Sequence, residues 1–156
     1  MLCLLLREGV PIRDMETILE TLGDHAGALK DIDIVTEYVR QALKRTITRR
    51  FAEANSLRVI TVDPKVEDTI VASVKKSDAG SYLAMDPDLI QKIVNITSGE
   101  IDKVKDVIPN VIILTSPIVR IYFKKLIDQF IPNITVLSYS EIDNTAQIQA
   151  IGNIAM

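Results

Sequence analysis

The stretch that decides the fold is Val111-Ile-Ile-Leu-Thr-Ser-Pro-Ile-Val-Arg-Ile-Tyr-Phe-Lys-Lys-Leu-Ile-Asp-Gln-Phe-Ile-Pro-Asn-Ile-Thr-Val-Leu-Ser138. Its first five residues are apolar or β-branched, which is typical of a buried strand. Ser116-Pro117 then supplies a helix N-cap and a first-turn proline, so a helix is expected over residues 118–130. A second strand is expected over 134–138. A strand, a helix and a strand in this order predict a parallel βαβ unit with a right-handed crossover.

The residues on either side of this unit extend the same pattern. Two Asp-Pro pairs, at 63–64 and 86–87, each begin a predicted helix, and the second helix is expected to break at Gly99. The periodicity of the apolar residues before, between and after these helices indicates strands. In chain order these further strands are predicted over residues 57–62, 81–85 and 147–151.

Residues 1–54 have helical periodicity instead. One apolar stripe follows a long helix in this region, through Val35, Val39, Ala42, Leu43, Ile47 and Phe51. The period changes after Asn55-Ser56. The predicted fold class is therefore α+β or α/β, with a small N-terminal helical subdomain over 1–54 and an α/β subdomain over 57–156 containing a mixed, partly parallel sheet. The α/β part is expected to fold alone, because it brings both a sheet and a covering helix.

Composition excludes several classes of protein. The chain has 156 residues, of which 47% are hydrophobic and 25% are charged, and this is typical of an ordered globular protein. The net charge of -3 gives no reason to expect nucleic acid as a partner. Cys3 is the only cysteine, so no intramolecular disulfide can form. The apolar start, residues 1–6, lacks a basic flank, so we interpret it as the last turns of a helix that begins upstream rather than a signal peptide.

Catalytic and cofactor-binding motifs are weak. His25 is the only histidine, and it is predicted to lie in an exposed loop between helices. The six glycines form neither a dinucleotide-binding nor a phosphate-binding loop, so no nucleotide is expected. No metal or other cofactor is expected either, and a catalytic nucleophile with its base is missing. We therefore predict that the chain is not an enzyme.

Polar residues at the predicted strand ends keep an enzymatic alternative open. Asp63 and Asp86 lie where ligands bind in open α/β sheets, and they could hold Mg²⁺. Ser116 could present backbone N–H groups to an anion. N-capping of the following helices is the interpretation that the adjacent prolines favour. A small α/β enzyme or phospho-ligand binder is the alternative function. A response-regulator-like domain would need an acidic pair after the first strand, where Asp63 stands alone.

Basic residues gather towards the end of the predicted long helix. They are Arg40, Lys44, Arg45, Arg49 and Arg50. Cations near a helix C-terminus interact favourably with its dipole, so a solvated helix end is one interpretation. A contact with another protein is the other. Nucleic acid is disfavoured, because no aromatic side chains interleave with these residues.

Several segments, in the same order, resemble the C-terminal cytoplasmic part of the FlhA family, the export-gate proteins of flagellar and injectisome type III secretion. Their sequences are Leu-Leu-Arg-Glu-Gly-Val-Pro-Ile-Arg-Asp at 5–14, Ile-Leu-Glu-Thr-Leu at 18–22, Thr-Glu-Tyr-Val-Arg-Gln-Ala-Leu at 36–43, Leu-Thr-Ser-Pro at 114–117 and Val-Leu-Ser-Tyr-Ser-Glu-Ile at 136–142. Ser140 is a departure, since the family more often has Asn there. The final Gln149-Ala-Ile-Gly152 looks more like flagellar members.

The resemblance implies a function without catalysis. Family members are integral to the bacterial inner membrane, and their cytoplasmic domains form a nonameric ring that receives export substrates and chaperones. The resemblance therefore implies that this chain is a soluble piece of a membrane-embedded protein, on the cytoplasmic face. Its implied partners are other copies of itself, export chaperones, substrates and components of the export apparatus. Because the family's ring uses the helical subdomain, we expect Arg40, Arg45 and Arg49 to meet acidic residues of a neighbouring copy.

Overall fold

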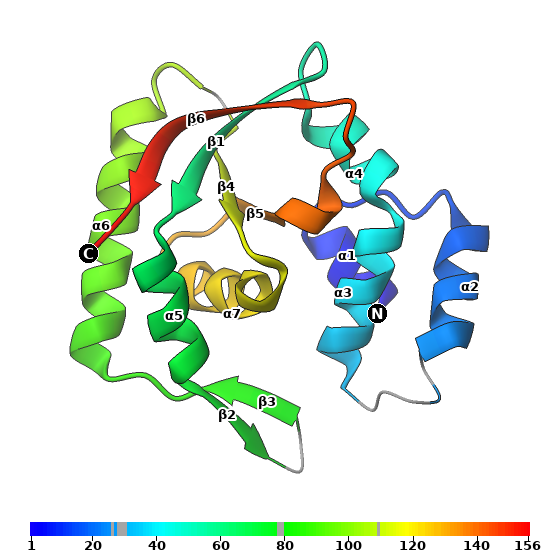
Figure 1. Cartoon of the computed structure of the whole chain (residues 1–156), viewed down its shortest axis with the longest axis horizontal. Helices are drawn as coiled ribbons and strands as arrows, with labels where there is room; N and C mark the ends of the chain where they lie inside the picture. The colour runs from blue at the N-terminus through cyan, green and yellow to red at the C-terminus, as the bar shows by residue number, and fades with distance from the viewer. Residues whose placement is uncertain (26, 28–30, 78–79, 109) are drawn as a thin grey trace. The chain divides into compact units, whose positions relative to one another are not determined.

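The structure is a computed structural model that describes residues 1–25, 27, 31–77, 80–108 and 110–156 (Figure 1). The chain forms two compact units. The helical unit comprises Met1–Leu57, Asp78–Gly80 and Ser140–Gln147, and the sheet unit comprises Arg58–Ser77, Ser81–Tyr139 and Ile148–Met156. Residues 140–147 therefore belong with the helices, although the sequence-based division near residues 54–57 does not assign them there. Independent folding of the α/β part stays a prediction.

The described part of the helical unit contains α1 (Leu2–Arg7), α2 (Met15–His25), α3 (Ile32–Ala42), α4 (Lys44–Phe51) and the last two residues of the 3-10 helix η1 (Tyr139–Glu141). The predicted long helix is divided at Leu43, which ends α3 and precedes α4. The predicted apolar stripe is buried at Val39, Leu43 and Ile47, whereas Ala42, predicted to belong to it, is exposed. Asp31 begins α3 by accepting a hydrogen bond from the backbone N–H of Asp33.

A four-stranded sheet with the order β5-β4-β1-β6 forms the centre of the sheet unit. Its strands are β1 (Ser56–Val62), β4 (Ile112–Thr115), β5 (Thr135–Ser138) and β6 (Gln147–Ile154). β4 is parallel to both β1 and β5, with Ile113 opposite Ile60 and Val136. The predicted βαβ unit and the edge strand are thus confirmed, and so is the mixed α/β class. β2 (Val74–Ser77) and β3 (Gly80–Leu83) form a separate two-stranded sheet.

Three helices flank this sheet in the described part of the unit: α5 (Pro64–Ala72), α6 (Pro87–Val104) and α7 (Pro117–Asp128). α7 packs against β4 and β5, and α5 packs against α7. Their apolar faces bury a shared core, which includes Ile60, Val66, Ile70, Ile93, Ile113, Val119, Phe123, Leu126, Ile127 and Val136. α6 passes Gly99 without the predicted break, because its buried face continues through Ile93, Thr97 and Ile101 on one side while Gly99 faces outward. The helix that Asp63-Pro64 begins ends at Ala72, and Val74 begins β2.

The central strand generates a stability prediction. Ile113→Ala should lower the free energy of unfolding by about 2–5 kcal/mol, because Ile113 is 0% exposed and its loss leaves a cavity between strand and helix. Ile118→Ala is the matched control, since Ile118 is 69% exposed at the start of α7 and should change stability by less than about 0.5 kcal/mol. Urea denaturation followed by circular dichroism measures both. Equal losses in the two variants would contradict the assignment of the core.

Candidate functional site

The strand-end aspartates cap helices, as the adjacent prolines indicated. Asp63 Oδ1 accepts a hydrogen bond of 2.9 Å from the backbone N–H of Lys65, and Asp86 Oδ1 accepts one of 2.9 Å from the N–H of Asp88. These carboxylates are therefore committed to the first turns of α5 and α6. In the described ranges, no group of three or more His, Cys, Asp or Glu side chains is placed to hold a metal ion.

The start of α7 is capped from outside its own sequence. The backbone N–H of Ser116 donates a 3.0 Å hydrogen bond to Oε1 of Glu67 on α5, while the Ser116 side chain makes no capping bond. Ser116 is the N-cap residue of α7 and is followed by proline, as predicted, but its own hydroxyl makes no capping bond. The Glu67 carboxylate therefore lies at the start of α7, where the sequence allowed an external anion to bind. It interacts favourably with the positive end of the α7 dipole. No local pattern predicts this contact, because Glu67 lies 49 residues from Ser116.

Removal of this carboxylate should weaken the sheet unit. Glu67→Ala should cost about 1 kcal/mol of unfolding free energy, because an N-terminal N–H of α7 loses its acceptor and the helix dipole loses a compensating charge. Glu67→Gln keeps an acceptor oxygen and should cost less. The adjacent exposed Asp68 on α5 supplies the control Asp68→Ala, expected near zero. Chemical denaturation distinguishes the three variants, and a cost for Asp68→Ala equal to that for Glu67→Ala would refute the cap.

His25 does not lie in the predicted exposed loop. It is the last residue of α2, is half-buried, and stacks on the ring of Tyr38 of α3, with ring centroids 4.2 Å apart. An aromatic stack between neighbouring helices is a packing contact. The histidine therefore contributes to the junction of α2 and α3.

Arg40 is separated from the other basic residues by its burial. Its side chain is 1% exposed, and it donates to Glu141 from Nε at 2.6 Å and from Nη2 at 3.1 Å. Its Nη1 atom lies 3.1 Å from Glu8 Oε2, in an ion pair without hydrogen-bond alignment. The assumption that Arg40 forms part of an exposed basic helix end is therefore incorrect. Glu141 is 101 residues away, so the helical pattern around Arg40 could not indicate the pair.

Thr48 fixes the backbone around the same glutamate. Its hydroxyl accepts a 2.9 Å hydrogen bond from the N–H of Asp143 and lies 3.4 Å from the carbonyl oxygen of Glu141, to which it donates. Thr48 belongs to α4, whereas Arg40 belongs to α3. Both helices therefore hold the segment 140–143, one through an ion pair and the other through backbone bonds.

Loss of one partner of the buried pair should be costly. Arg40→Met should destabilise the chain by about 3–5 kcal/mol, because it leaves the fully buried Glu141 carboxylate without its cation. Arg40→Met combined with Glu141→Leu should be less destabilised than Arg40→Met alone, since no unpaired buried charge then remains at residue 141. Thermal and urea unfolding measure this cycle. Lys105→Met serves as the control, because the Lys105–Asp102 pair is exposed on both sides and should contribute little. Additive effects of the two buried substitutions would rule out the coupling.

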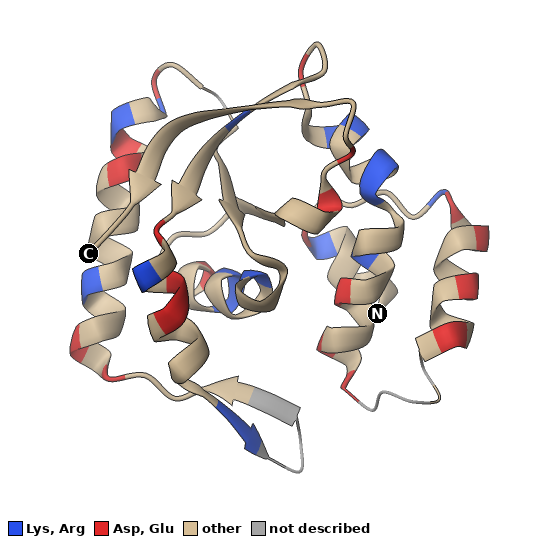
Figure 2. Cartoon of the chain, in the orientation of Figure 1, with Lys and Arg blue, Asp and Glu red and all other residues tan. Residues whose placement is uncertain are grey.

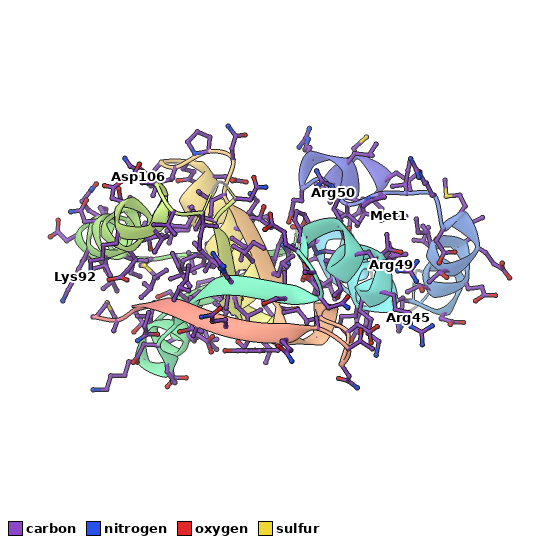
Figure 3. All side chains as sticks on the ribbon, turned by 90° about the horizontal axis from the view of Figure 1, so that it is seen from above. Met1, Arg45, Arg49, Arg50, Lys92 and Asp106 are labelled. Atoms are coloured by element: carbon purple, nitrogen blue, oxygen red, sulfur yellow. The ribbon has the colours of Figure 1, made fainter. Side chains whose placement is uncertain are left out.

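The exposed cations lie on α4, and they border a hollow. Arg45 is 80% exposed, with its Nε 4.0 Å from Asp143, and Arg49 and Arg50 are also exposed (Figure 3). A hollow of about 540 Å³ is lined by Arg45, Thr48, Arg49, Ala52, Ala54, Asn55, Asp143 and Thr145. α4 contains no acidic residue (Figure 2). The exposed charges that α4 contributes to this hollow are cationic, which suits an acidic protein surface, although the lining also includes Asp143 and neutral polar groups.

Among the helices of the described ranges, none is both long enough and apolar enough to cross a bilayer.

Known relatives match the chain over nearly its whole length. Flagellar biosynthesis protein FlhA of Bacillus subtilis is 40% identical over 149 residues, which are 95% of this chain and 22% of the relative. Invasion protein InvA of Salmonella typhimurium is 31% identical over 150 residues, 96% of this chain and 22% of the relative. The chain thus spans about a fifth of the length of these relatives.

Solved structures reproduce the fold. The Chlamydia pneumoniae CdsV protein has a TM-score of 0.87 and 37% identity over 97% of this chain and 43% of its own, and it has also been solved in complex with CdsO. SctV-C from EPEC, described as nonameric, has a TM-score of 0.84 and 32% identity over 96% of this chain and 45% of its own. The model of the FHIPEP family matches residues 1–147. This chain therefore belongs to the FHIPEP family, and the predicted resemblance to the FlhA proteins is confirmed.

Proposed function

We propose that this chain is part of the cytoplasmic domain of a type III protein export gate and that it works within a ring of identical copies. The observation that carries the proposal is likeness over 96% of the chain to a protein solved as a nonamer, at 32% identity. The TM-score of 0.84 supports a shared fold over the matched part. The parent protein is then embedded in the inner membrane, with this part on the cytoplasmic face.

A flagellar gate is the favoured kind. The Bacillus subtilis flagellar relative is 40% identical, whereas the Salmonella typhimurium invasion relative is 31% identical over a similar length. The proposed role is to assemble with and recognise other proteins rather than to catalyse a reaction. Its partners are other copies of the chain, components of the export apparatus, export chaperones and their substrates. The solved complex of CdsV with CdsO supports the proposal that components of the export apparatus are among these partners.

The exposed cations of α4 are the proposed contact residues of the ring. Arg45 and Arg49 lie one helical turn apart on an exposed face, and within the described residues Arg45 has only a long 4.0 Å ion pair. Arg40 was expected to act with them. Because its guanidinium is committed to Glu141 and Glu8, we propose for Arg40 the role of holding α3 against these residues.

Export in the source bacterium tests the proposal. Removal of the coding region for this chain from its parent gene should abolish secretion of flagellar filament protein and swimming in soft agar, because the ring loses a contacting part. Restoration of the region on a plasmid is the control. Loss of other secreted proteins with normal swimming would favour an injectisome gate. Unchanged secretion of every protein would sink the proposed function.

A further inference from the structure

The strand β6 forms one edge of the four-stranded sheet. In the order β5-β4-β1-β6 its hydrogen-bonded neighbour among the described strands is β1, and its arrow runs along the outside of β1 in Figure 1. An edge strand presents a row of unpaired N–H and C=O groups, and these pair readily with a strand of another chain. Proteins therefore protect their edge strands, and the two edges of this sheet differ in that protection.

The edge strand at the other end of the sheet, β5, is tied to α7 by two cations. Arg120 Nη1 donates a 3.1 Å hydrogen bond to the carbonyl oxygen of Val136 in β5, and Lys124 Nζ donates one of 2.6 Å to the carbonyl oxygen of Ile134 just before it. The last three residues of β5 are also buried. Backbone acceptors of β5 thus already have donors within the chain, and charged side chains are a usual protection of an edge.

The first half of β6 lacks such protection. The strand has eight residues, with no charged residue and no proline among them, and residues 147–150 are exposed. Lysine, proline and short length are common means of preventing an edge from pairing. The second half lies closer to α6, since a Cβ atom at Gly152 would be 2.9 Å from Glu100 Oε2. The open part of the edge is therefore residues 147–150.

The alternation of the strand decides which backbone groups point outward. The N–H of Gln147 donates a 2.8 Å hydrogen bond to the carbonyl oxygen of Asn55, which directly precedes β1. In a strand that is paired on one side, alternate residues direct their N–H and C=O groups towards the neighbouring strand. Gln149 therefore directs these groups towards β1, whereas Ile148 and Ala150 direct theirs away from it.

We propose that β6 of one copy pairs with β6 of a second copy, antiparallel, about a two-fold axis that passes between their Gln149 residues. In this register Ile148 of each copy lies opposite Ala150 of the other. Each of these is a hydrogen-bonded pair that exchanges two N–H···O bonds, so the outward groups of both residues are satisfied. The two Gln149 residues form the non-hydrogen-bonded pair between them, where side chains approach most closely.

A second copy suits this edge for three reasons. Ile148 is 45% exposed, and it would cover the exposed Ala150 of the other copy, because opposite residues share a face of the sheet. The two Gln149 amides can each donate to and accept from the other. No like charges meet, because the strand has no charge. Pairing of β6 with β5 of another copy is disfavoured, since β5 is buried and bonded to α7.

This contact goes beyond the proposed ring and does not depend on it. A two-fold contact joins two copies and cannot by itself close a ring of more than two. It is also small, because only a few residues of each copy meet. We therefore expect a weak dimer, with a dissociation constant on the order of 1 mM, since stable interfaces bury more than about 1,000 Å².

Charge substitution at the axis tests the proposal by sedimentation equilibrium of the 156-residue chain at concentrations up to about 2 mM. Gln149→Lys and Gln149→Glu should each weaken dimerisation roughly tenfold, because like charges then lie directly opposite. An equimolar mixture of the two variants should associate at least as tightly as the wild-type chain. Recovery on mixing is expected only where residue 149 of one copy meets residue 149 of another.

A backbone variant and a matched control complete the test. Ala150→Pro removes an outward N–H, which a free edge tolerates, so it should abolish dimerisation and leave the circular dichroism spectrum unchanged. Gln129→Lys adds the same charge at an exposed glutamine after α7 and should leave dimerisation unchanged.

Hydrogen exchange followed by NMR locates the contact. The amides of Ile148 and Ala150 should exchange more slowly as the concentration of the wild-type chain rises. A wild-type chain that stays monomeric overturns the proposal, as does a mixture of folded Gln149→Lys and Gln149→Glu chains that associates no better than either alone. Protection of these amides only when a peptide of alternating Thr and Val is added would assign the edge to another partner and also overturn it. None of these outcomes bears on export, which the deletion tests separately.

Discussion

The buried ion pair between Arg40 and Glu141 is the constraint on which the helical unit depends. A guanidinium and a carboxylate that are 1% and 0% exposed can be tolerated only with close, aligned contacts, because each has lost its hydration. The pair meets this condition with two hydrogen bonds in the fork geometry that arginine favours. It also joins three segments that carried the family resemblance. Residues 5–14 supply Glu8, 36–43 supply Arg40 and 136–142 supply Glu141, so these matching segments meet at one cluster.

The pair has a consequence for the last strand. Arg40 of α3 binds Glu141 and Thr48 accepts from the Asp143 N–H, and a few residues later the N–H of Gln147 donates to the carbonyl of Asn55. That bond begins β6 beside β1. Ala54 and Asn55 both have positive φ values, of 50° and 62°, which turn the chain from α4 into β1 at this point. A left-handed alanine costs energy, so the surrounding bonds must maintain the turn.

Local chemistry was predictable from the sequence, and long-range chemistry was not. Asp63 and Asp86 were correctly interpreted as caps because donor and acceptor lie two residues apart. The βαβ unit was predictable because a strand, a capped helix and a strand leave one favoured topology. Glu67 at Ser116, and Glu141 at Arg40, escaped prediction because only the folded chain brings them together. The same limit applies to the candidate interface. The basic cluster was visible in sequence, but only the structure separates buried Arg40 from exposed Arg45.

That separation decides what each arginine can do. Arg40 is neutralised at short range by two carboxylates, so its charge contributes little to the field outside the protein. Arg45 and Arg49 lie in solvent, where ion pairs within one chain contribute little stability. Exposed charges of one sign act instead on the orientation and rate of encounter with another surface. The exposed cations of α4 are therefore well suited to orienting a neighbouring molecule of opposite charge.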